Sequence, residues 1–557
     1  MAVAAVAQAR KSGLSVTAIA ALAGLGLGLL ALGPALGRGY VLAYDMVFVP
    51  DPRFSATMFG LTGTLPRAVP SDAVVTALAT ALPADVVQKL ILLTIFVFAC
   101  AGPARLLAGE HWLARLAAGV FYAWNPFVAE RLLIGQWALL LGYAGLPWVL
   151  AALTRPALGL PRSSWRLALA LLPAAAGGFA AMSVSALVAL PAAALRPGHP
   201  RQRWLLTAIT AGLLGLLSLP WLIPALTRHV DTSTAGVAAF AARADTPFGS
   251  TGSVLMLGGG WNAQTVPAGY GGWLSVFWLL LAALALGGFL LRGRGRWPGL
   301  GPAACVGLAL ALLGTFGPGQ HALRLLIGAW AGFAVLRDGQ QFAAPLALAE
   351  AAGLGLAVAR LLTVRRPQAL ADGRVLVAGA LMLAPVLFLP GLAWGAAGRL
   401  RPVEYPASWL AARRVMNSDP VTGSAVLLPW ESYRRFGWND GEAMLDPWPR
   451  LLNRTVIWND GVQVGPARLP PEDPSAAALD NLIRSGQPLT ARLEAAGVRF
   501  VIVDAGLPAA RPPAVQPPAG LPPAGPGAVA SAPALAGRLA GCTIAYSGPG
   551  IVVYRVP

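Results

Sequence analysis

Runs of about twenty consecutive apolar residues recur along the first 398 positions, and short arginine-rich segments separate them. The clearest runs cover residues 14–36, 86–108, 204–226, 271–291 and 375–397. Segments of this length and polarity are typical of helices that cross a bilayer. We therefore predict a polytopic α-helical membrane protein with about 10–12 spans.

Two segments depart from the simple pattern. Residues 167–195 are apolar but are interrupted by Pro173, Gly177–Gly178 and Pro191, and basic residues flank both ends. This segment must go out and come back, which predicts two short or broken helices. Residues 317–362 contain two apolar halves separated by Leu336–Phe342. Charge parity then predicts that residues 321–336 form a re-entrant dip that leaves Arg337 and Asp338 on the outer side.

After position 399 the pattern changes to short β-type runs. Residues 425–428 and 498–504 predict buried strands, and residues 543–546 and 551–555 predict a closing hairpin. A helical pattern fills 474–496, and residues 507–534 form a Pro-rich insert. The chain therefore divides into a transmembrane domain, 1–398, and a C-terminal extracytoplasmic α/β domain, 399–557.

The distribution of basic residues predicts the topology. Arg10 and Lys11 precede the first span and place the N-terminus in the cytoplasm, and the C-terminal domain is then outside the plasma membrane. Residues 37–85 and 227–270 become external loops. In the first loop, Ser71 and Asp72 are expected to cap a surface helix whose apolar stripe includes Val74, Val75, Leu78 and Leu82.

Composition agrees with a membrane protein, since 56% of the 557 residues are hydrophobic and only 11% are charged. The net charge of +18 does not indicate nucleic acid, because the arginines lie in short loops where they encode topology. The chain has 3 cysteines and 4 scattered histidines, so it offers neither a disulfide framework nor a His or Cys metal cluster.

Few charged residues are available at the outer ends of the predicted spans. They are Asp45 and Asp51 after the first span, Glu130 and Arg131 after the third, and Arg337 and Asp338 beside the re-entrant segment. One interpretation is that neighbouring acid–arginine pairs are salt bridges that lock the bundle. The other is a wet site in which arginines bind a lipid-linked phosphate and a carboxylate acts as general base.

This arrangement resembles the GT-C glycosyltransferases, which have an early external acid, a surface helix in the same loop and an external C-terminal domain. The runs Asn125–Arg131 with Gln136 and Trp137, and Leu336–Phe342, resemble the actinobacterial branch that includes arabinofuranosyltransferases of cell-wall arabinan. The resemblance covers roughly residues 14–460 in layout, and its motifs are short.

The resemblance implies a polyprenyl-phosphate sugar as donor and a cell-envelope glycan as acceptor. Asp45 maps onto the catalytic base, with Asp51 as the substitute, and Arg131 or Arg337 would hold the departing phosphate. A single displacement with inversion needs only one base. A divalent metal is compatible with the family, but Tyr44 stands where many relatives have a second acid, so no cofactor is assigned.

The outer domain contains an aromatic segment with interspersed acids that includes Trp430 and Tyr433. These side chains are candidates for binding acceptor sugar rings, and packing of a small domain core explains such tryptophans as well. Two other functions remain open on the sequence. The broken segments also suit a transporter or flippase of a lipid-linked intermediate, and the outer domain also suits a non-catalytic envelope-assembly protein.

Overall fold

The computed structural model describes residues 15–62, 65–154, 160–227, 232–363, 371–464, 467–504 and 537–557. The predicted Pro-rich insert 507–534 and the basic pair Arg10 and Lys11 lie outside the described residues. The chain forms two compact units. The first, called here the helical unit, comprises 1–36, 89–222 and 240–398, and the second, called the mixed unit, comprises 37–88, 223–239 and 399–557.

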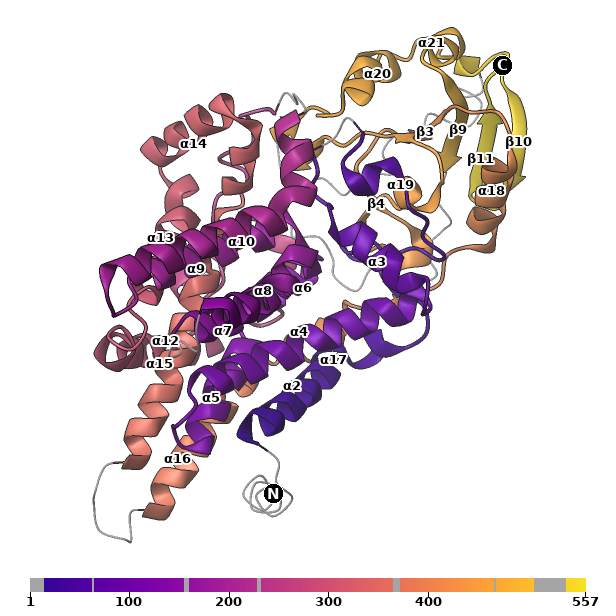
Figure 1. Cartoon of the computed structure of the whole chain (residues 1–557). Helices are drawn as coiled ribbons and strands as arrows, with labels where there is room; N and C mark the ends of the chain where they lie inside the picture. Colours follow the sequence, from indigo (N-terminus) through magenta and orange to yellow (C-terminus); the bar gives the residue numbers. More distant parts are fainter. Residues whose placement is uncertain are drawn as a thin grey trace. The chain divides into compact units, whose positions relative to one another are not determined.

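The helical unit consists of helices that follow the predicted apolar runs closely (Figure 1). Its longer helices are α2 (Val16–Leu32), α4 (Ala84–Leu106), α5 (Trp112–Ala123), α7 (Trp137–Thr154), α8 (Leu160–Gly177), α9 (Phe179–Ala194), α10 (Pro200–Thr227), α12 (Leu274–Gly288), α13 (Leu300–Leu312), α14 (Gly317–Ala329), α15 (Ala344–Thr363) and α16 (Ala371–Phe388). Shorter ones are α6 (Pro126–Leu133), α11 (Gly249–Leu255) and α17 (Ala393–Gly398). Two short 3₁₀ helices of this unit are η6 (Ala331–Leu336) and η7 (Gly339–Ala343).

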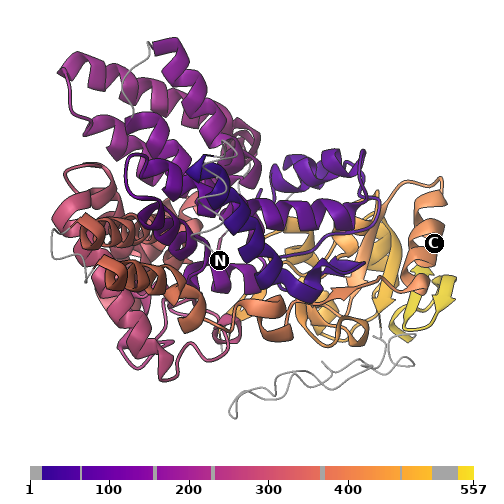
Figure 2. The same ribbon diagram turned by 90° about the horizontal axis from the view of Figure 1, so that it is seen from below.

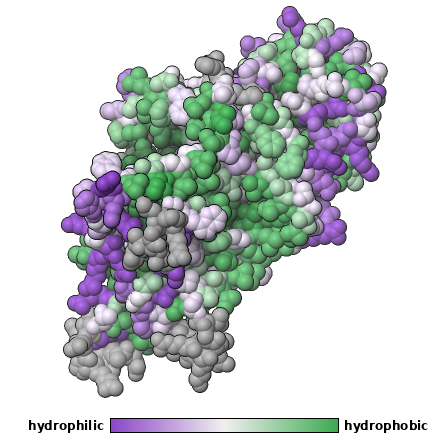
Figure 3. All heavy atoms as spheres, viewed as in Figure 1, coloured by the Kyte–Doolittle hydropathy of each residue, from purple (hydrophilic) through white to green (hydrophobic). Residues whose placement is uncertain are grey.

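Among the described residues, six helices are long and apolar enough to cross a membrane, and a bent pair makes up to seven. The two shorter apolar helices, Phe179–Ala194 and Gly373–Phe388, bring this total to nine, so ten to twelve spans stay a prediction. The span that contains α15 is 94% buried within the protein, whereas those of α2 and α10 are 28% buried. Peripheral helices thus present apolar side chains outward, and Figure 3 shows hydrophobic residues over the face that carries α10. That is the surface a bilayer requires.

The predicted break within residues 167–195 is confirmed, whereas the predicted re-entrant dip over residues 321–336 stays a prediction. Helices α8 and α9 are separated at Gly178, whose φ of 81° is open to glycine but strained for other residues. The pair Leu300–Thr315 and Gly317–Ala329 is bent by 98°, which is the geometry of a broken span or a re-entrant loop. Helix α15 packs tightly at Gly353, where a Cβ atom would meet the carbonyl oxygen of Ala285.

The mixed unit contains a five-stranded sheet with the order β10-β11-β9-β3-β6. Strands β3 (Ser424–Leu428), β9 (Val498–Asp504), β10 (Thr543–Gly548) and β11 (Ile551–Arg555) confirm the predicted strands and hairpin, and β6 (Val456–Ile457) completes the sheet. Strand β3 is parallel to β6 and β9, whereas β11 is antiparallel to β9. Helices α18 (Ala407–Ser418), α19 (Trp448–Leu451), α20 (Pro474–Arg484) and α21 (Thr490–Ala495) complete the predicted α/β character.

Apolar clusters cover both faces of this sheet. Successive residues of a strand point to opposite faces, so neighbouring residues of β3 belong to different clusters. Ala425 and Leu427 pack with Trp409 of α18 in one apolar cluster. Val426 and Leu428 pack in a second cluster, which includes residues of α20 and α21. Figure 2 shows the C-terminal strands, in yellow, beside the orange helix α18.

The segment predicted to be the first external loop, residues 37–85, belongs to the mixed unit. Strand β1 (Tyr40–Val41) pairs with β2 (Pro402–Val403), and the Gln88 side chain accepts from and donates to the Val41 backbone. The helix predicted in this loop exists as α3 (Ser71–Ala79), and its place on a membrane surface stays a prediction. Its predicted cap is wrong: the N-cap residue is Pro70, and the Ser71 hydroxyl donates to the Ala68 carbonyl instead. A polar side chain next to the helix start found a nearer acceptor in the preceding turn.

Candidate active site

Asp45 lies in a tight turn of the mixed unit. Ala43 and Met46 exchange backbone hydrogen bonds across it, at 2.8 and 3.2 Å. Tyr44 has a φ of +44°, a strained value for a residue with a side chain. Its N–H donates to the Ala443 carbonyl at 2.7 Å, and its carbonyl accepts from Leu445 at 2.8 Å. The carboxylate is therefore presented by a backbone that the C-terminal segment holds in place.

Tyr433 binds this carboxylate directly. Its hydroxyl donates to Asp45 Oδ1 at 2.5 Å, although the two residues are 388 positions apart. Tyr433 lies on β4 (Tyr433–Arg435), which pairs with β5 (Ala443–Leu445), the strand that also holds Tyr44. Burial and the Asp45 charge raise the pKa of Tyr433 well above its ordinary value. The phenol consequently stays protonated and acts as a donor.

Arg67 adds a positive charge close to Asp45 and Tyr433. Its guanidinium donates to Glu472 at 2.6 Å, and its side chain is 54% exposed. Asp45, Tyr433 and Asp460 lie near enough to influence its charge. Arg67 could not be predicted as a site residue from the sequence, because one arginine in a long loop carries no local pattern.

Asp460 shapes the loop behind this arginine. Its carboxylate accepts from the backbone N–H groups of Glu472 and Asp473, directly before α20. Burial raises the pKa of Asp460 to about 6, while the bond from Asp473 and the Arg67 charge oppose that shift. Asp460 therefore holds the backbone directly before α20, and its carboxyl has a pKa of about 6.

Two residues predicted for the site are placed differently. Asp51 is exposed, with φ +46°, and its backbone carbonyl accepts from Arg413 at 2.7 Å. Trp430 is 7% exposed and packs in an apolar cluster, where its indole donates to Asp480 at 2.8 Å. The core-packing interpretation thus describes the contacts of Trp430, while Tyr433 reaches Asp45.

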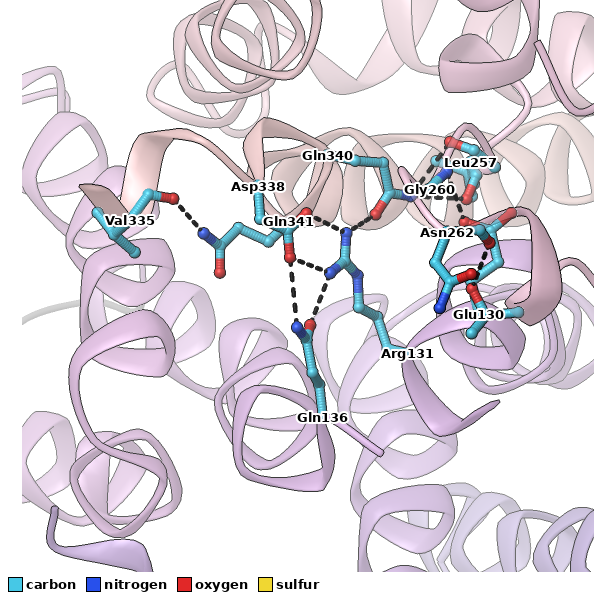
Figure 4. A network of polar contacts seen from close by, with 12 residues as sticks. Glu130, Arg131, Gln136, Leu257, Gly260, Asn262, Val335, Asp338, Gln340 and Gln341 are labelled. Atoms are coloured by element: carbon cyan, nitrogen blue, oxygen red, sulfur yellow. Dashed lines mark hydrogen bonds and ion pairs between the residues drawn. The ribbon is translucent and has the colours of Figure 1, made fainter. Parts of the chain in front are cut away.

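Arg131 and Asp338, two of the predicted charged residues of the helical unit, belong to one network of polar contacts (Figure 4). Arg131 is 2% exposed and donates to both carboxylate oxygens of Asp338, at 2.6 and 3.1 Å. It also donates to Gln136 at 2.6 Å and to Gln340 of η7. Arg131 therefore pairs with an acid 207 positions away, and most of its donors are used within the protein.

Glu130 faces a different loop. Its carboxylate accepts from the Gly260 N–H at 2.9 Å, and the carboxyl of Asp245 lies within hydrogen-bonding reach. Asp245 in turn accepts from the Gly259 N–H at 2.6 Å. Burial, followed by repulsion from Asp245, raises the pKa of Glu130 well above its ordinary value. A second carboxyl close to a buried one disfavours the ionised form of the buried group.

Arg337 is 8% exposed, and its guanidinium lies 5.5 Å from the centre of the Phe240 ring. It belongs to the helical unit, as do Glu130, Arg131, Gln136 and Asp338, whereas Asp45, Asp51, Trp430 and Tyr433 belong to the mixed unit. The convergence of the two sets on one cavity stays a prediction.

The donors around Asp45 do not match a metal site. Among the described residues, no group of three or more His, Cys, Asp or Glu side chains is arranged to hold a metal ion. Asp45 instead contacts a phenol hydroxyl and lies near a guanidinium, both of which are donors. Hard divalent cations require several oxygen ligands, so no step is assigned to a metal.

Fold and sequence together define a polytopic helical membrane protein with an added α/β region. The fold is similar to the cryo-EM structure of arabinofuranosyltransferase AftD from mycobacteria, with a TM-score of 0.62 and 18% identity, over 97% of this chain and 40% of that chain. A mutant of AftD aligns with a TM-score of 0.57 and 18% identity, over 97% and 41%. The predicted resemblance is confirmed at the level of fold.

This chain thus spans about two fifths of the length of AftD. An oligosaccharyltransferase from Archaeoglobus fulgidus aligns with a TM-score of 0.40 and 15% identity, over 88% of this chain and 68% of that one, a similarity too low to support an inference. No protein-family profile and no curated protein sequence matches the chain.

Proposed function

We propose that the protein is an integral-membrane glycosyltransferase that moves a sugar from a polyprenyl-phosphate donor to a cell-envelope glycan acceptor with inversion. Arabinofuranosyl is the more specific candidate for the sugar, and mannosyl is the other. In this proposal the chain lies in the plasma membrane with its N-terminus in the cytoplasm and its C-terminal region outside. A fold similar to AftD over 97% of the chain supports the class of reaction.

The observation that carries the proposal is the presentation of Asp45 at a strained turn, in contact with a polar cluster. Strain of this kind persists only where the surrounding structure holds it, and it recurs at functional sites. A solvated helix cap needs neither a left-handed Tyr44 nor a half-buried phenol donor. A general base needs both a fixed orientation and an ionised carboxylate.

In the proposed reaction, the acceptor hydroxyl oxygen attacks the anomeric carbon of the donor while Asp45 accepts the hydroxyl proton. The bond from the anomeric carbon to the phosphate oxygen breaks, and its electron pair leaves with the polyprenyl phosphate. The negative charge that grows on this oxygen needs a cationic partner. One attack from the face opposite the leaving group inverts the anomeric centre.

Arg67 lies near Asp45, and 54% of its side chain is exposed. Its guanidinium is therefore accessible to a substrate. Arg131 is 2% exposed and donates to Asp338, Gln136 and Gln340. We therefore add Arg67 to Arg131 and Arg337 as a candidate for binding the phosphate, and we assign Arg131 mainly to holding the loop that carries Asp338.

The test uses the full-length protein in lipid nanodiscs, with radiolabelled polyprenyl-phosphate arabinofuranose or mannose and short arabinan or mannan acceptors. We expect Asp45→Asn to lower the rate of transfer by about 10²–10⁴-fold, the usual contribution of a general base. Asp51→Asn is the matched control, because this exposed acid lies in the same loop, and we expect near-normal transfer. Full activity of Asp45→Asn would remove Asp45 as the base.

A transporter or flippase gives a different result in the same system. Reconstituted in vesicles, it would move the labelled lipid between leaflets without forming a glycan product, and Asp45→Asn would leave that movement unchanged.

A further inference from the structure

Tyr433 reaches Asp45 through a backbone arrangement that leaves little freedom to either partner. Residue Tyr433 opposes Leu445 in the β4–β5 ladder, and Leu445 donates its N–H to the carbonyl of Tyr44. The tyrosine and the turn are therefore attached to the same strand, β5. Tyr44 and Tyr433 also pack together, with ring centres 6.0 Å apart. The Tyr433 hydroxyl donates its hydrogen bond to one oxygen of the Asp45 carboxylate, Oδ1.

A hydroxyl in this position changes the chemistry of a carboxylate in a defined direction. A donor hydrogen bond stabilises the ionised form of a carboxylate more than its protonated form. The bond also fixes the rotation of the carboxyl group, which otherwise turns readily. Because the Tyr433 hydroxyl stays protonated, it cannot itself take the proton of an acceptor hydroxyl.

We propose that Tyr433 is a positioning residue that keeps Asp45 ionised and orients its carboxylate toward the acceptor hydroxyl. This inference rests on the proposed function, in which Asp45 is the base. During transfer the acceptor proton moves to Asp45, and Tyr433 keeps its own proton throughout. Tyr433, a candidate for sugar binding in the sequence, thus acts on Asp45, the proposed base.

The test is the pH dependence of transfer by Tyr433→Phe, measured in nanodiscs with the same labelled arabinofuranose and mannose lipids. Loss of the donor destabilises the ionised base, so we expect the acidic limb of the kcat profile to move to higher pH. A hydrogen bond to a charged group corresponds to a shift of about one to two pH units. At pH 6 we expect kcat to fall more than at pH 8, with KM changed less than kcat.

Tyr405→Phe is the matched control. Tyr405 is buried in the mixed unit, and its hydroxyl donates to the segment that contains Asp45, at the Phe48 carbonyl, 2.9 Å away. Its removal carries the structural cost of losing a buried hydroxyl without touching Asp45. We expect similar losses of thermal stability in both variants, but an unchanged acidic limb in Tyr405→Phe.

Site-specific 3-fluorotyrosine at position 433 provides a measurement with minimal effect on folding. Fluorination makes the phenol a stronger donor, so the acidic limb should move to lower pH, opposite to the effect of Tyr433→Phe. The inference is overturned if the limb stays in place in both position-433 proteins, or moves equally in Tyr405→Phe. Retained activity in Asp45→Asn overturns the proposed base instead, so the two failures are distinguishable.

Discussion

The buried pair of Arg131 and Asp338 allows a quantitative test of how the helical unit is held together. The perturbation is Asp338→Asn, which keeps the shape of the side chain but removes its charge. Arg131 is 2% exposed, so water cannot replace the lost counter-charge. Asparagine offers one acceptor oxygen where the carboxylate offered two, at 2.6 and 3.1 Å from the guanidinium.

Breaking a buried ion pair by removing one partner costs about 3–5 kcal/mol. We expect about 3 kcal/mol, the lower end of that range, because the side-chain oxygens of Gln136 and Gln340 still accept from Arg131. The Arg296–Glu110 pair is the control. Its 2.7 Å contact is nearly as short, but the side chains are 34% and 28% exposed. For Glu110→Gln we expect less than about 1 kcal/mol.

The assay is chemical unfolding of the full-length protein in detergent micelles, followed by tryptophan fluorescence. Arg131→Met combined with Asp338→Leu should recover much of the loss, because no unpaired charge is then left inside the protein. If Asp338→Asn destabilises the protein no more than Glu110→Gln does, burial is not the source of the strength of the pair, and the reasoning fails.

Two further predictions follow from buried carboxyls. The folded state raises the pKa of Asp460 from 3.8 to about 6, so this group binds a proton more tightly when folded, and its contribution to stability falls as pH rises from about 4 to 6, by about 3 kcal/mol in total. Asp460→Asn should flatten that part of the stability–pH curve relative to wild type, and an unchanged difference between pH 4.5 and pH 7 would contradict the assignment. Glu350 of α15 is 0% exposed, and neither carboxyl oxygen has a hydrogen-bond partner among the described residues. Glu350→Met should therefore raise the free energy of unfolding by about 1–3 kcal/mol, and a lower melting temperature would indicate that this acid has a favourable partner.

Much of the secondary structure could be predicted from the sequence because its signals are local. Apolar length encodes helices such as α2 and α4, and the break at Gly178 follows from small residues within one segment. Strands β3 and β9 follow from short β-branched runs bounded by polar residues. Asp45 and Tyr433 were each identified as candidates, but for unrelated reasons.

Only the tertiary structure decided which candidates meet. Asp45 and Tyr433 are 388 positions apart, and Arg131 and Asp338 are 207 positions apart. The charge of Arg131 is satisfied by Asp338 and not by its neighbour Glu130, which turns to Gly260 instead. Adjacent residues on a helix point in different directions, so sequence proximity does not select a partner. Packing of distant segments makes that choice, and no local pattern records it.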